Sequence, residues 1–412
     1  MREGPANPHY VGLDIGTSQV RCVVGVRDAS DPSVVSVVGH GISGNQGMRR
    51  GVVMHVDETV EAVVQAITEA ERIAGVRIEH ATVNVNGSHV AGMNSRGTIA
   101  ISSPNREITL EDRDRVEEAA AIVKLPANRE ILQVFAKNYR LDGQDNLKDP
   151  VGMRGVRLEV DCHILTAATP NVRNLDLVLE KAGVRPKHRT VSALAAAEAS
   201  LDRKQKEAGT AVLDIGAGTT NLAVIEDGEI QHIAVIPMGG IHITNDLAIG
   251  LKTDLDVAEQ VKLKHVHIGD TTDKTYRVLV DGAGYTFEQA ETNMIVEARV
   301  DELLEYVDKE LQRIHRSRKL PGGVVIVGGT AALPGLAEYT KEKLQLPARI
   351  GAIRGLAGLV DTVAEPSFAT AAGLMMLDIL LAPFANDQVP TTDFFGGGLP
   401  HSLTALFKKI RR

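Results

Sequence analysis

The sequence has no tryptophan, and only 3 % of its 412 residues are aromatic. A β-sandwich built on large aromatic side chains is therefore disfavoured. The chain instead contains 39 glycines and 43 % apolar residues, among them many valines, isoleucines and alanines. This balance favours α/β layers, and at ~150 residues per domain the length suggests roughly two to four domains.

Cysteine is nearly absent. Cys22 and Cys162 lie in segments that resemble strands, and they form neither a Cys-x-x-Cys pair nor a cluster with metal-ligand spacing. This excludes a disulfide framework and a zinc centre built on cysteines. We predict that both are buried free thiols.

Long apolar runs are also missing. The longest, from Ala371 to Ala382, is interrupted by Asp378 and falls short of the ~20 residues that span a bilayer. The first nine residues carry charges and two prolines but no apolar stretch, so they do not resemble a secretory signal. We expect a protein of the cytoplasm without a transmembrane helix.

The body of the chain has no excess of basic residues, since the formal net charge is −8. The last twelve residues hold four of the 45 lysines and arginines and no acid, so the other 400 residues carry −12. An acidic body argues against a nucleic-acid-binding face, and we expect no nucleic-acid partner. The short basic tail needs a separate explanation.

Two common phosphate-binding loops are missing as well: GxxxxGK[ST] does not occur, and residues 216–218 do not continue as GxGxxG before a helix. A repeat is present instead, because Leu-Asp-Ile-Gly occurs at residues 13–16 and again at 213–216. Each copy predicts an apolar strand, a tight glycine turn and a second apolar strand. Glycine turns let backbone approach an anion, so two facing turns would clamp a polyphosphate.

The two hairpins supply the predicted metal and phosphate ligands. Strand-end carboxylates can hold a hydrated magnesium ion, and we assign this role to Asp14 and Asp214. A single turn of this kind is more often an ordinary hairpin, but two matched copies favour binding. The predicted phosphate cradle consists of Gly16, Thr17, Ser18, Gly216, Gly218, Thr219 and Thr220.

Two segments after the second hairpin fit the same site. Gly239 and Gly240 follow a strand, and residues 244–246 have the composition of a helix start. In the helix expected over residues 254–265, Glu259 and Lys262 share a face and can reach a ribose and a phosphate. For that pair alone, a surface ion pair is the simpler interpretation.

A third segment predicts the adenosine end of the site. Residues 324–327 form an apolar strand that leads into Gly328, Gly329 and Thr330. A turn without side chains permits a flat adenine to lie against backbone.

Taken together and in this order, these segments resemble the nucleotide-binding motifs of the actin, Hsp70 and sugar-kinase superfamily. Within it the chain is similar to the FtsA family of bacterial actin-like cell-division proteins. The resemblance covers essentially the whole chain and is specific at residues 13–18, 86–89, 94–97, 258–262 and 328–335. It implies an α/β, actin-like fold of two duplicated RNase H-like domains around a nucleotide cleft, with an inserted 1C subdomain of the SHS2 type.

The same resemblance implies a division of the chain into subdomains, followed by a linker and a tail. The expected parts are 1A (1–83 and 164–204), 1C (84–163), 2A (205–239 and 304–382), 2B (240–303), a flexible linker (383–400) and an amphipathic membrane-targeting helix (401–412).

The tail can also be interpreted without the family. Its apolar residues recur at helical spacing and share one face, while its basic residues gather at the C-terminal end. A core-packing helix is the usual interpretation, but the glycine-rich linker before it favours an in-plane anchor on anionic lipid. The predicted membrane-binding residues are Leu403, Leu406, Phe407, Lys408, Lys409, Ile410, Arg411 and Arg412.

The resemblance implies ATP and Mg²⁺ as cofactors, protofilaments of this chain, and a location on the cytoplasmic face of the cell membrane at the division site. It also implies that the chain tethers FtsZ filaments and recruits other membrane division proteins through 1C. Arg299 matches a family contact position for the FtsZ C-terminal tail. Gln19 stands where a lysine is frequent, which removes one positive charge from the phosphate site.

No catalytic residue is identified. Hydrolysis needs a side chain that orients the attacking water, and the segment expected to supply it, residues 191–198, is mostly alanine. Glu198 is the one candidate there, although a solvated helix residue is the simpler interpretation. We expect slow or undetectable ATPase activity.

Two other functions remain open. A PilM-like actin-fold adaptor of pilus assembly shares the 1C-type insertion. A sugar or acid kinase shares the nucleotide motifs, but it needs a substrate-activating carboxylate and has no use for an amphipathic tail. Attachment to a membrane through the tail, with FtsZ as the partner, discriminates the FtsA-like function from both.

Overall fold

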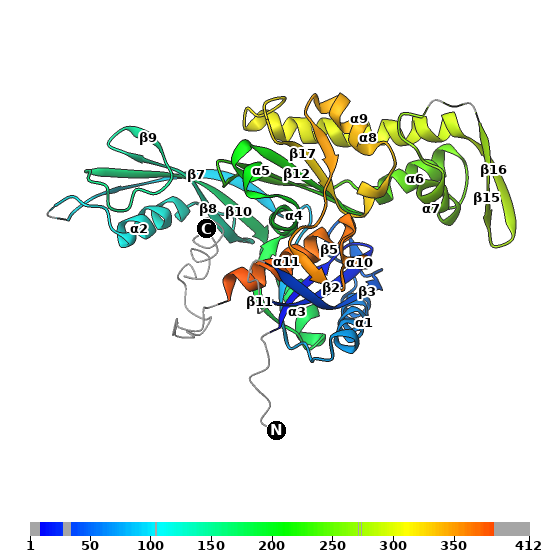
Figure 1. Ribbon diagram of the computed structural model, residues 1–412, viewed down its shortest axis with the longest axis horizontal. Coiled ribbons are helices and arrows are strands. Elements are labelled where there is room, and N and C mark those ends of the chain that lie inside the picture. The colour runs from blue at the N-terminus through cyan, green and yellow to red at the C-terminus, as the bar shows by residue number, and fades with distance from the viewer. Residues whose placement is uncertain (1–8, 28–33, 104, 271, 273, 383–412) are drawn as a thin grey trace, which may run out of the picture.

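The computed structural model describes residues 9–27, 34–103, 105–270, 272 and 274–382. Figure 1 shows two larger α/β bodies near the centre, with a smaller body at each end of the long axis. The tail residues predicted to bind membrane lie outside the described residues. Within the described ranges, no helix is both long enough and apolar enough to cross a membrane.

The first central body contains a six-stranded sheet in the order β11-β6-β1-β2-β3-β19. Strands β1, β2 and β3 form an antiparallel meander, and β6 and β11 continue it in parallel. Two short strands, β4 (Met48–Arg49) and β5 (Val52–Val53), form a separate pair. The sheet strands are β1 (Tyr10–Ile15), β2 (Gln19–Arg27), β3 (Val35–Gly44), β6 (His80–Val85), β11 (Arg185–Val191) and β19 (Leu356–Gly358).

The second central body repeats this plan. Its five-stranded sheet has the order β14-β13-β12-β17-β18, with three antiparallel strands followed by two parallel ones. The shared order shows that the Leu-Asp-Ile-Gly repeat marks two copies of one unit. The strands are β12 (Thr210–Ile215), β13 (Thr220–Glu226), β14 (Glu229–Ile236), β17 (Gly323–Val327) and β18 (Ala348–Ile350).

Helices join the two sheets and cover their outer faces. Helix α11 packs on β1 and on α4, and α4 also contacts β12 and β13, so this helix pair connects the two bodies. Helix α1 packs on β2 and β3, and α3 packs on α1. The helices are α1 (Val56–Ala74), α3 (Thr169–Lys181), α4 (Ser192–Ser200), α5 (Arg203–Ala208), α9 (Leu336–Leu344), α10 (Val360–Val363) and α11 (Ala369–Leu381).

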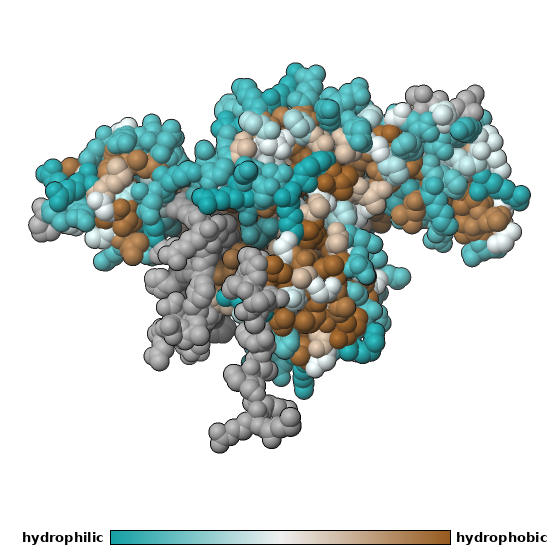
Figure 2. Space-filling model, in the orientation of Figure 1, coloured by the Kyte–Doolittle hydropathy of each residue, from teal (hydrophilic) through white to brown (hydrophobic). Residues whose placement is uncertain are grey.

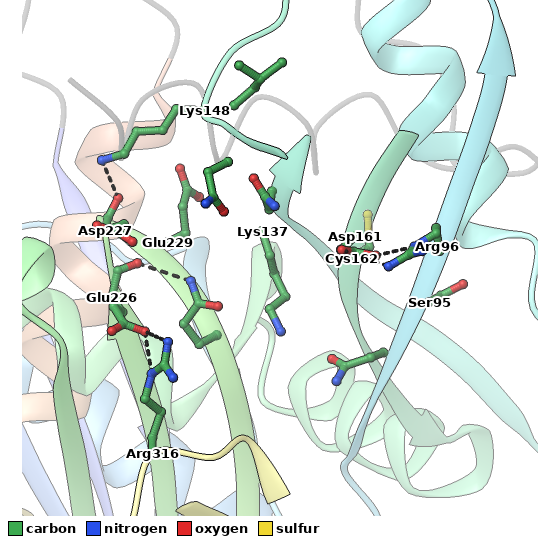
Figure 3. A pocket seen from close by; sticks show the side chains of 15 residues that line it. Ser95, Arg96, Lys137, Lys148, Asp161, Cys162, Glu226, Asp227, Glu229 and Arg316 are labelled. Atoms are coloured by element: carbon green, nitrogen blue, oxygen red, sulfur yellow. Dashed lines mark hydrogen bonds and ion pairs between the residues drawn. The ribbon is translucent and has the colours of Figure 1, made fainter. Parts of the chain in front are cut away.

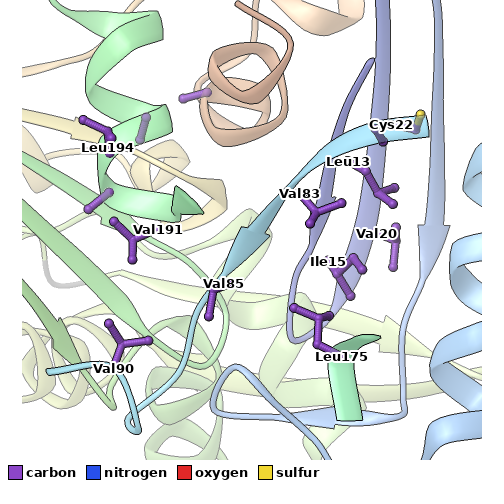
Figure 4. Close-up of a cluster of buried hydrophobic side chains, with 14 of the residues drawn as sticks. Leu13, Ile15, Val20, Cys22, Val83, Val85, Val90, Leu175, Val191 and Leu194 are labelled. Atoms are coloured by element: carbon purple, nitrogen blue, oxygen red, sulfur yellow. The ribbon is translucent and has the colours of Figure 1, made fainter. Parts of the chain in front are cut away.

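Side chains point alternately to the two faces of β1 and β2, and this alternation explains both which residues enter the core and where Asp14 lies. Leu13, Ile15, Val20 and Cys22 turn into a cluster of buried side chains (Figure 4). The opposite face of β1 lies so close to α11 that a Cβ on Gly12 would come within 2.1 Å of the Ala371 carbonyl oxygen. Asp14 stands on that second face, one residue before the end of β1, because side chains alternate along a strand.

Both cysteines are buried free thiols, as predicted. Burial raises the pKa of the Cys22 thiol to about 12 and that of Cys162 to about 12. Both are therefore protonated at neutral pH and belong to the core.

One end body, on the left of Figure 1, is inserted between β6 and β11. Its sheet has the order β7-β10-β8-β9 and carries α2, which begins at a capping box between Thr109 and Asp112. Strands β7, β8 and β10 contact β14 of the second central body. The elements are β7 (Ala91–Ala100), α2 (Leu110–Ala121), β8 (Arg129–Leu141), β9 (Gln144–Leu147) and β10 (Arg157–Ala168).

The other end body follows β14. Helix α6 packs on α7 and α8, and the hairpin β15–β16 extends from them. The prediction that this first helix starts at residues 244–246 is wrong, since α6 begins at Gly240. The elements are α6 (Gly240–Gly250), α7 (Leu255–Lys264), β15 (Thr275–Val280), β16 (Ala283–Glu288) and α8 (Gln289–Arg313).

Candidate functional site

The two glycine turns have the same backbone frame. Gly16 N donates to the Gln19 carbonyl at 3.0 Å, and Gly216 N donates to the Thr219 carbonyl at 2.9 Å. Asp14 pairs across its hairpin with Arg21, as Asp214 does with Asn221. Each aspartate is therefore displayed at the same place in its own half.

The two turns also approach one another. A Cβ on Gly218 would lie 2.8 Å from Thr17 Oγ1, so only a glycine fits beside that threonine without a shift. Gly51 N donates to Thr17 Oγ1 at 3.0 Å, and Asn86 Nδ2 donates to Thr219 Oγ1 at 3.0 Å. The turn between β4 and β5 thus contacts the first glycine turn, and Asn86 in the loop after β6 reaches across to the second.

Asp14 and Asp214 form a desolvated pair of carboxylates. Burial, together with the charge of Asp214, raises the pKa of Asp14 to about 7, and burial also raises the pKa of Asp214. Two buried negative charges are stabilised by a cation, and carboxylate oxygens are ligands that Mg²⁺ accepts, usually with water in between. The donor set therefore fits the predicted magnesium ion.

Neutral donors, which the sequence did not reveal, orient these aspartates. Asn84 Nδ2 donates to Asp14 Oδ1 at 2.7 Å and to Ser192 Oγ at 3.1 Å. Thr370 Oγ1 donates to Asp214 Oδ2 at 3.1 Å. One signal was available: Thr82 and Asn84 are polar residues that alternate with apolar ones in β6.

The start of α6 is attached to the second turn. Gly240 N donates to the Gly216 carbonyl at 2.9 Å, and Thr330 Oγ1 donates to the same oxygen at 3.1 Å. A Cβ on Gly239 would lie 2.4 Å from that oxygen. These contacts explain why the helix begins four residues earlier than predicted, and they bring Gly239, Gly240 and Thr330 to the second glycine turn.

Glu259 and Lys262 also lie at this helix start. Lys262 Nζ donates to Glu259 Oε2 at 2.6 Å, to Thr244 Oγ1 at 2.8 Å and to the Gly240 carbonyl at 3.4 Å. The side chain of Lys262 is only 11 % exposed. Glu259 and Lys262 therefore lie beside Gly240. The lysine is buried and also bonds α6, so the two residues are not an isolated surface ion pair.

Gly328 and Gly329 have different roles. Gly328 has a φ of +90°, and a Cβ there would lie 2.6 Å from Asp214 Oδ1, so this residue supports the aspartate. A Cβ on Gly329 would meet no atom of the described residues within 4 Å. Gly329 thus faces open space, as a glycine beside an adenine would.

Thr220 begins β13, directly after the second turn. Its side chain is fully buried, and its hydroxyl donates to the Met238 carbonyl at 2.8 Å. That hydroxyl ties the start of β13 to the segment between β14 and α6, and the assignment of Thr220 to the phosphate cradle stays a prediction. Ser18, by contrast, is exposed in the first turn.

Glu198 and Arg299 are both engaged in ion pairs. Glu198 accepts from Lys206 Nζ at 2.6 Å, and it lies six residues beyond Ser192, about 9 Å along α4 at 1.5 Å per residue. Arg299 is paired with Asp246 of α6 and with Glu302. The structure thus places Glu198 away from the Asn84 network and Arg299 in the end body that contains α6.

A separate cleft of about 900 Å³ lies between the inserted body and the second central body (Figure 3). Its walls are ion-paired, by Arg96 with Asp161 and by Arg316 with Glu226. Lys148 joins the two bodies at the rim, with Nζ 2.9 Å from the Asp227 carbonyl oxygen. None of the residues that line this cleft is among the predicted nucleotide ligands.

Comparison with known proteins identifies relatives that cover about nine-tenths of the chain. The family described as "Cell division protein FtsA" matches residues 211–373, and "SHS2 domain inserted in FTSA" matches residues 87–166. The cell division protein FtsA of Pseudomonas aeruginosa is 35 % identical over 379 residues, covering 89 % of this chain and 88 % of that protein. FtsA of Bacillus subtilis is 37 % identical over 374 residues, covering 90 % and 83 %.

Solved structures agree on the fold. The PilM–PilN type IV pilus biogenesis complex contains a chain that aligns with a TM-score of 0.64 at 17 % identity, covering 90 % of this chain and 98 % of that chain. MreB5 of Spiroplasma citri bound to ADP aligns with a TM-score of 0.53 at 14 % identity, covering 90 % and 96 %. The predicted actin-like α/β fold and the SHS2-type insertion are confirmed.

Proposed function

Because the chain belongs to the FtsA family of cell-division proteins, we propose that it binds Mg-ATP and links the division machinery to the membrane. In this proposal it polymerises on the inner face of the cytoplasmic membrane at the division site, tethers FtsZ filaments there and recruits other membrane division proteins through its inserted body. ATP acts as an assembly ligand and is hydrolysed slowly or not at all.

The observation that carries the nucleotide proposal is the pair of facing hairpins. Asp14 and Asp214 come from equivalent positions of two copies of one unit, and the Thr17 and Gly218 turns lie against each other. Bound magnesium would supply charge neutralisation of the phosphates. Backbone N–H groups of the two turns would bind phosphate oxygens, and the residues around Gly240 and Gly329 would bind the ribose and adenine.

Gly329 offers a clean test of this site. A Cβ there meets no atom of the described residues within 4 Å, so we expect Gly329→Ala to leave the fold intact, and the larger side chain of Gly329→Val would fill the volume assigned to adenine. We expect calorimetry with Mg-ATP to give a graded loss, small for Gly329→Ala and about 100-fold or more for Gly329→Val. Unchanged affinity in the folded valine variant would contradict the site.

The apolar surface of the end body that contains α6 supports a docking site for the FtsZ tail. Ile249, Leu263 and Met294 are 77 %, 64 % and 64 % exposed on α6, α7 and α8, three helices in mutual contact through α6. Arg299 lies on the same α8. An apolar peptide segment with an acidic residue would match this combination.

The ion pairs of Arg299 determine how it should be tested. Arg299→Glu would place three carboxylates together, with Asp246 and Glu302, and could unfold the region. Arg299→Gln and Ile249→Asp are therefore better variants. We expect each to weaken binding of an FtsZ tail peptide in a fluorescence titration while Mg-ATP binding is kept, and unchanged peptide affinity in both would remove this surface from the interface.

Membrane attachment is proposed from the tail sequence alone, since residues 401–412 lie outside the described residues. Vesicle co-sedimentation should compare the full chain, a chain ending at Pro400, and Phe407→Glu. We expect only the full chain to sediment with anionic vesicles, and less so as salt rises, because the basic residues are screened. Equal sedimentation of all three would refute the anchor and favour the soluble alternatives.

Self-assembly is the remaining part of the proposal. Electron microscopy of the full chain with ATP on anionic lipid monolayers should show protofilaments in which subunits contact one another through the two end bodies. Monomeric particles in every nucleotide state would contradict it.

A further inference from the structure

Lys137 of β8 points into the cleft between the inserted body and the second central body. Figure 3 shows its side chain between the two walls, with Asp161 on one side and Arg316 on the other. Its ammonium group forms no hydrogen bond or ion pair with any described residue. Burial lowers the pKa of Lys137, while Asp161 acts against this effect and Arg316 adds to it. A positive charge is therefore held partly out of water without a bonded counter-ion.

A β-bulge directs Lys137 into the cleft. Lys137 is the extra residue where the ladder between β8 and β10 shifts its register. Before the bulge, residues 134 and 136 pack into the core that includes residues of α2, and after it residues 139 and 141 do so. The alternation of β8 thus shifts by one residue, so that both Lys137 and Asn138 face away from this core. The bulge places an ammonium group and an amide side by side on the wall of the cleft.

The carboxylates on either side of Lys137 in Figure 3 are already ion-paired. Arg96 Nε donates to Asp161 Oδ1 at 2.7 Å, and Arg316 Nε donates to Glu226 Oε2 at 2.7 Å. Neither carboxylate can bond Lys137 without giving up part of its own pairing. The counter-ion of Lys137 therefore has to come from outside these residues.

Two amides that line the cleft also have unused donors. Asn138 makes no side-chain hydrogen bond with any described residue. His163 Nε2 accepts from Ile233 N at 3.1 Å, so His163 Nδ1 carries the proton and donates to Asn94 Oδ1 at 2.9 Å. This leaves Asn94 Nδ2 without an acceptor among the described residues. One ammonium group and two amides thus offer donors, which suits a ligand with an anionic oxygen group.

We propose that this cleft binds a small organic acid, whose carboxylate pairs with Lys137 and accepts from the Asn138 amide. One unpaired cation matches one negative charge, and Asp227 on the exposed β13–β14 turn at the rim disfavours a more highly charged phosphate. A cleft of about 900 Å³ is large enough for a whole small molecule. Because its walls belong to two bodies, a bound acid would also hold these bodies together. The site is separate from the proposed nucleotide site.

The first test follows Lys137 itself in the full chain. Its amine is labelled briefly with an amine-reactive ester, and the labelling rate is measured by mass spectrometry in sodium chloride and in sodium acetate, gluconate or glutarate of equal ionic strength. We expect a carboxylate at twice its dissociation constant to slow the labelling about threefold, since one third of the chain is then free. Exposed Lys124 of the same body is the internal control and should label at an unchanged rate.

Two outcomes of the labelling would overturn the proposal. One is an equal rate at Lys137 in chloride and in all three carboxylates. The other is protection by inorganic phosphate without protection by any carboxylate, which would contradict the assigned ligand class. Asn138→Ala should weaken the protection, whereas Asn105→Ala, which removes an exposed asparagine of the same body, should leave it unchanged.

A second measurement separates binding from a structural role of Lys137. Because its ammonium group has no bonded partner among the described residues, we expect Lys137→Gln to fold with an unchanged or higher Tm. The Tm of the unchanged chain should rise with the concentration of the protecting carboxylate. Lys124→Gln should keep this rise and Lys137→Gln should lose it. A rise that persists in Lys137→Gln would overturn the site.

Discussion

The β1–β2 hairpin and the β12–β13 hairpin share a register but differ in the residue that faces the aspartate. Asp14 faces Arg21, and Asp214 faces Asn221, whose side-chain amide lies 3.3 Å from Asp214 Oδ2. A duplicated backbone thus carries a cation in one half and a neutral donor in the other. The repeat determines where the carboxylates stand, while the side chains that face them determine the electrostatic environment of each carboxylate.

The largest expected effect tests whether the two halves are equivalent in their cores. Leu13 and Leu213 occupy the same place in the repeat, and both are fully buried. Leu13→Ala and Leu213→Ala should each lower the free energy of unfolding by about 3 kcal/mol, because each leaves a cavity. Urea denaturation measures this, with the exposed Leu263→Ala as a control that should change it by less than about 0.5 kcal/mol.

The next effect separates binding from stability at Asp14. Its pKa is about 7 in the folded chain against 3.8 for an unperturbed aspartate, so the folded state holds the proton more tightly. Stability of the nucleotide-free chain therefore falls as pH rises from about 4 to about 7. Asp14→Asn cannot ionise at this position, so it should raise the free energy of unfolding of the nucleotide-free chain at pH 8 by about 1–4 kcal/mol. The same variant should bind Mg-ATP about 100-fold more weakly.

Thermal unfolding at pH 5 and pH 8, each with and without Mg-ATP, measures both effects of Asp14→Asn. The variant should gain stability at pH 8 and show little of the stabilisation by Mg-ATP. A variant that is destabilised at pH 8 without nucleotide would show that burial of the Asp14 charge beside Asp214 does not lower the free energy of unfolding.

A smaller effect concerns the neutral donors of the second half. Asn221→Ala and Thr370→Val each remove one hydrogen bond to Asp214, and each should cost about 1–2 kcal/mol. Because the two donors share one carboxylate oxygen, the double variant should cost more than the sum of the single variants. Strictly additive losses in urea denaturation would mean that the donors act independently.

The smallest effect distinguishes the two turn glycines. An added Cβ would lie 2.7 Å from the Gln19 carbonyl oxygen at Gly16, but 3.3 Å from the Thr219 carbonyl oxygen at Gly216. Gly16→Ala should therefore cost about 1–2 kcal/mol and Gly216→Ala less than about 1 kcal/mol. Equal costs in paired thermal unfolding curves would show that the first turn relaxes as easily as the second.

Much of the site was predictable because it is local in sequence. The repeat predicted both hairpins, and the helix expected over residues 254–265 is observed at Leu255–Lys264. Strand alternation and turn composition act over a few residues, so they can be read directly from the chain. The same pattern does not reveal that the Thr220 hydroxyl donates to the Met238 carbonyl, a contact with the segment that follows β14.

The missed residues are those whose role depends on distant partners. Asn84 of β6 and Thr370 of α11 donate to the two aspartates, and Ser192 of α4 accepts from Asn84. Asn84 is 70 residues from Asp14 in the chain, and Thr370 is 156 residues from Asp214. Nothing in the local sequence around Thr370 indicates that its hydroxyl will contact Asp214. The early start of α6 has the same cause, because the Gly216 carbonyl captures the Gly240 amide.

The sequence alone determined that this chain has two copies of an Asp-Ile-Gly hairpin, an acidic body and an apolar and basic tail, because these follow from local composition and periodicity. Only the tertiary structure decided that Arg21 stands beside both aspartates, that Gly328 supports Asp214 while Gly329 faces open space, and that Thr220 is buried. These outcomes depend on how two sheets, joined through α4 and α11, bring together atoms that the chain keeps about 200 residues apart, and close packing fixes such contacts only once both halves have formed.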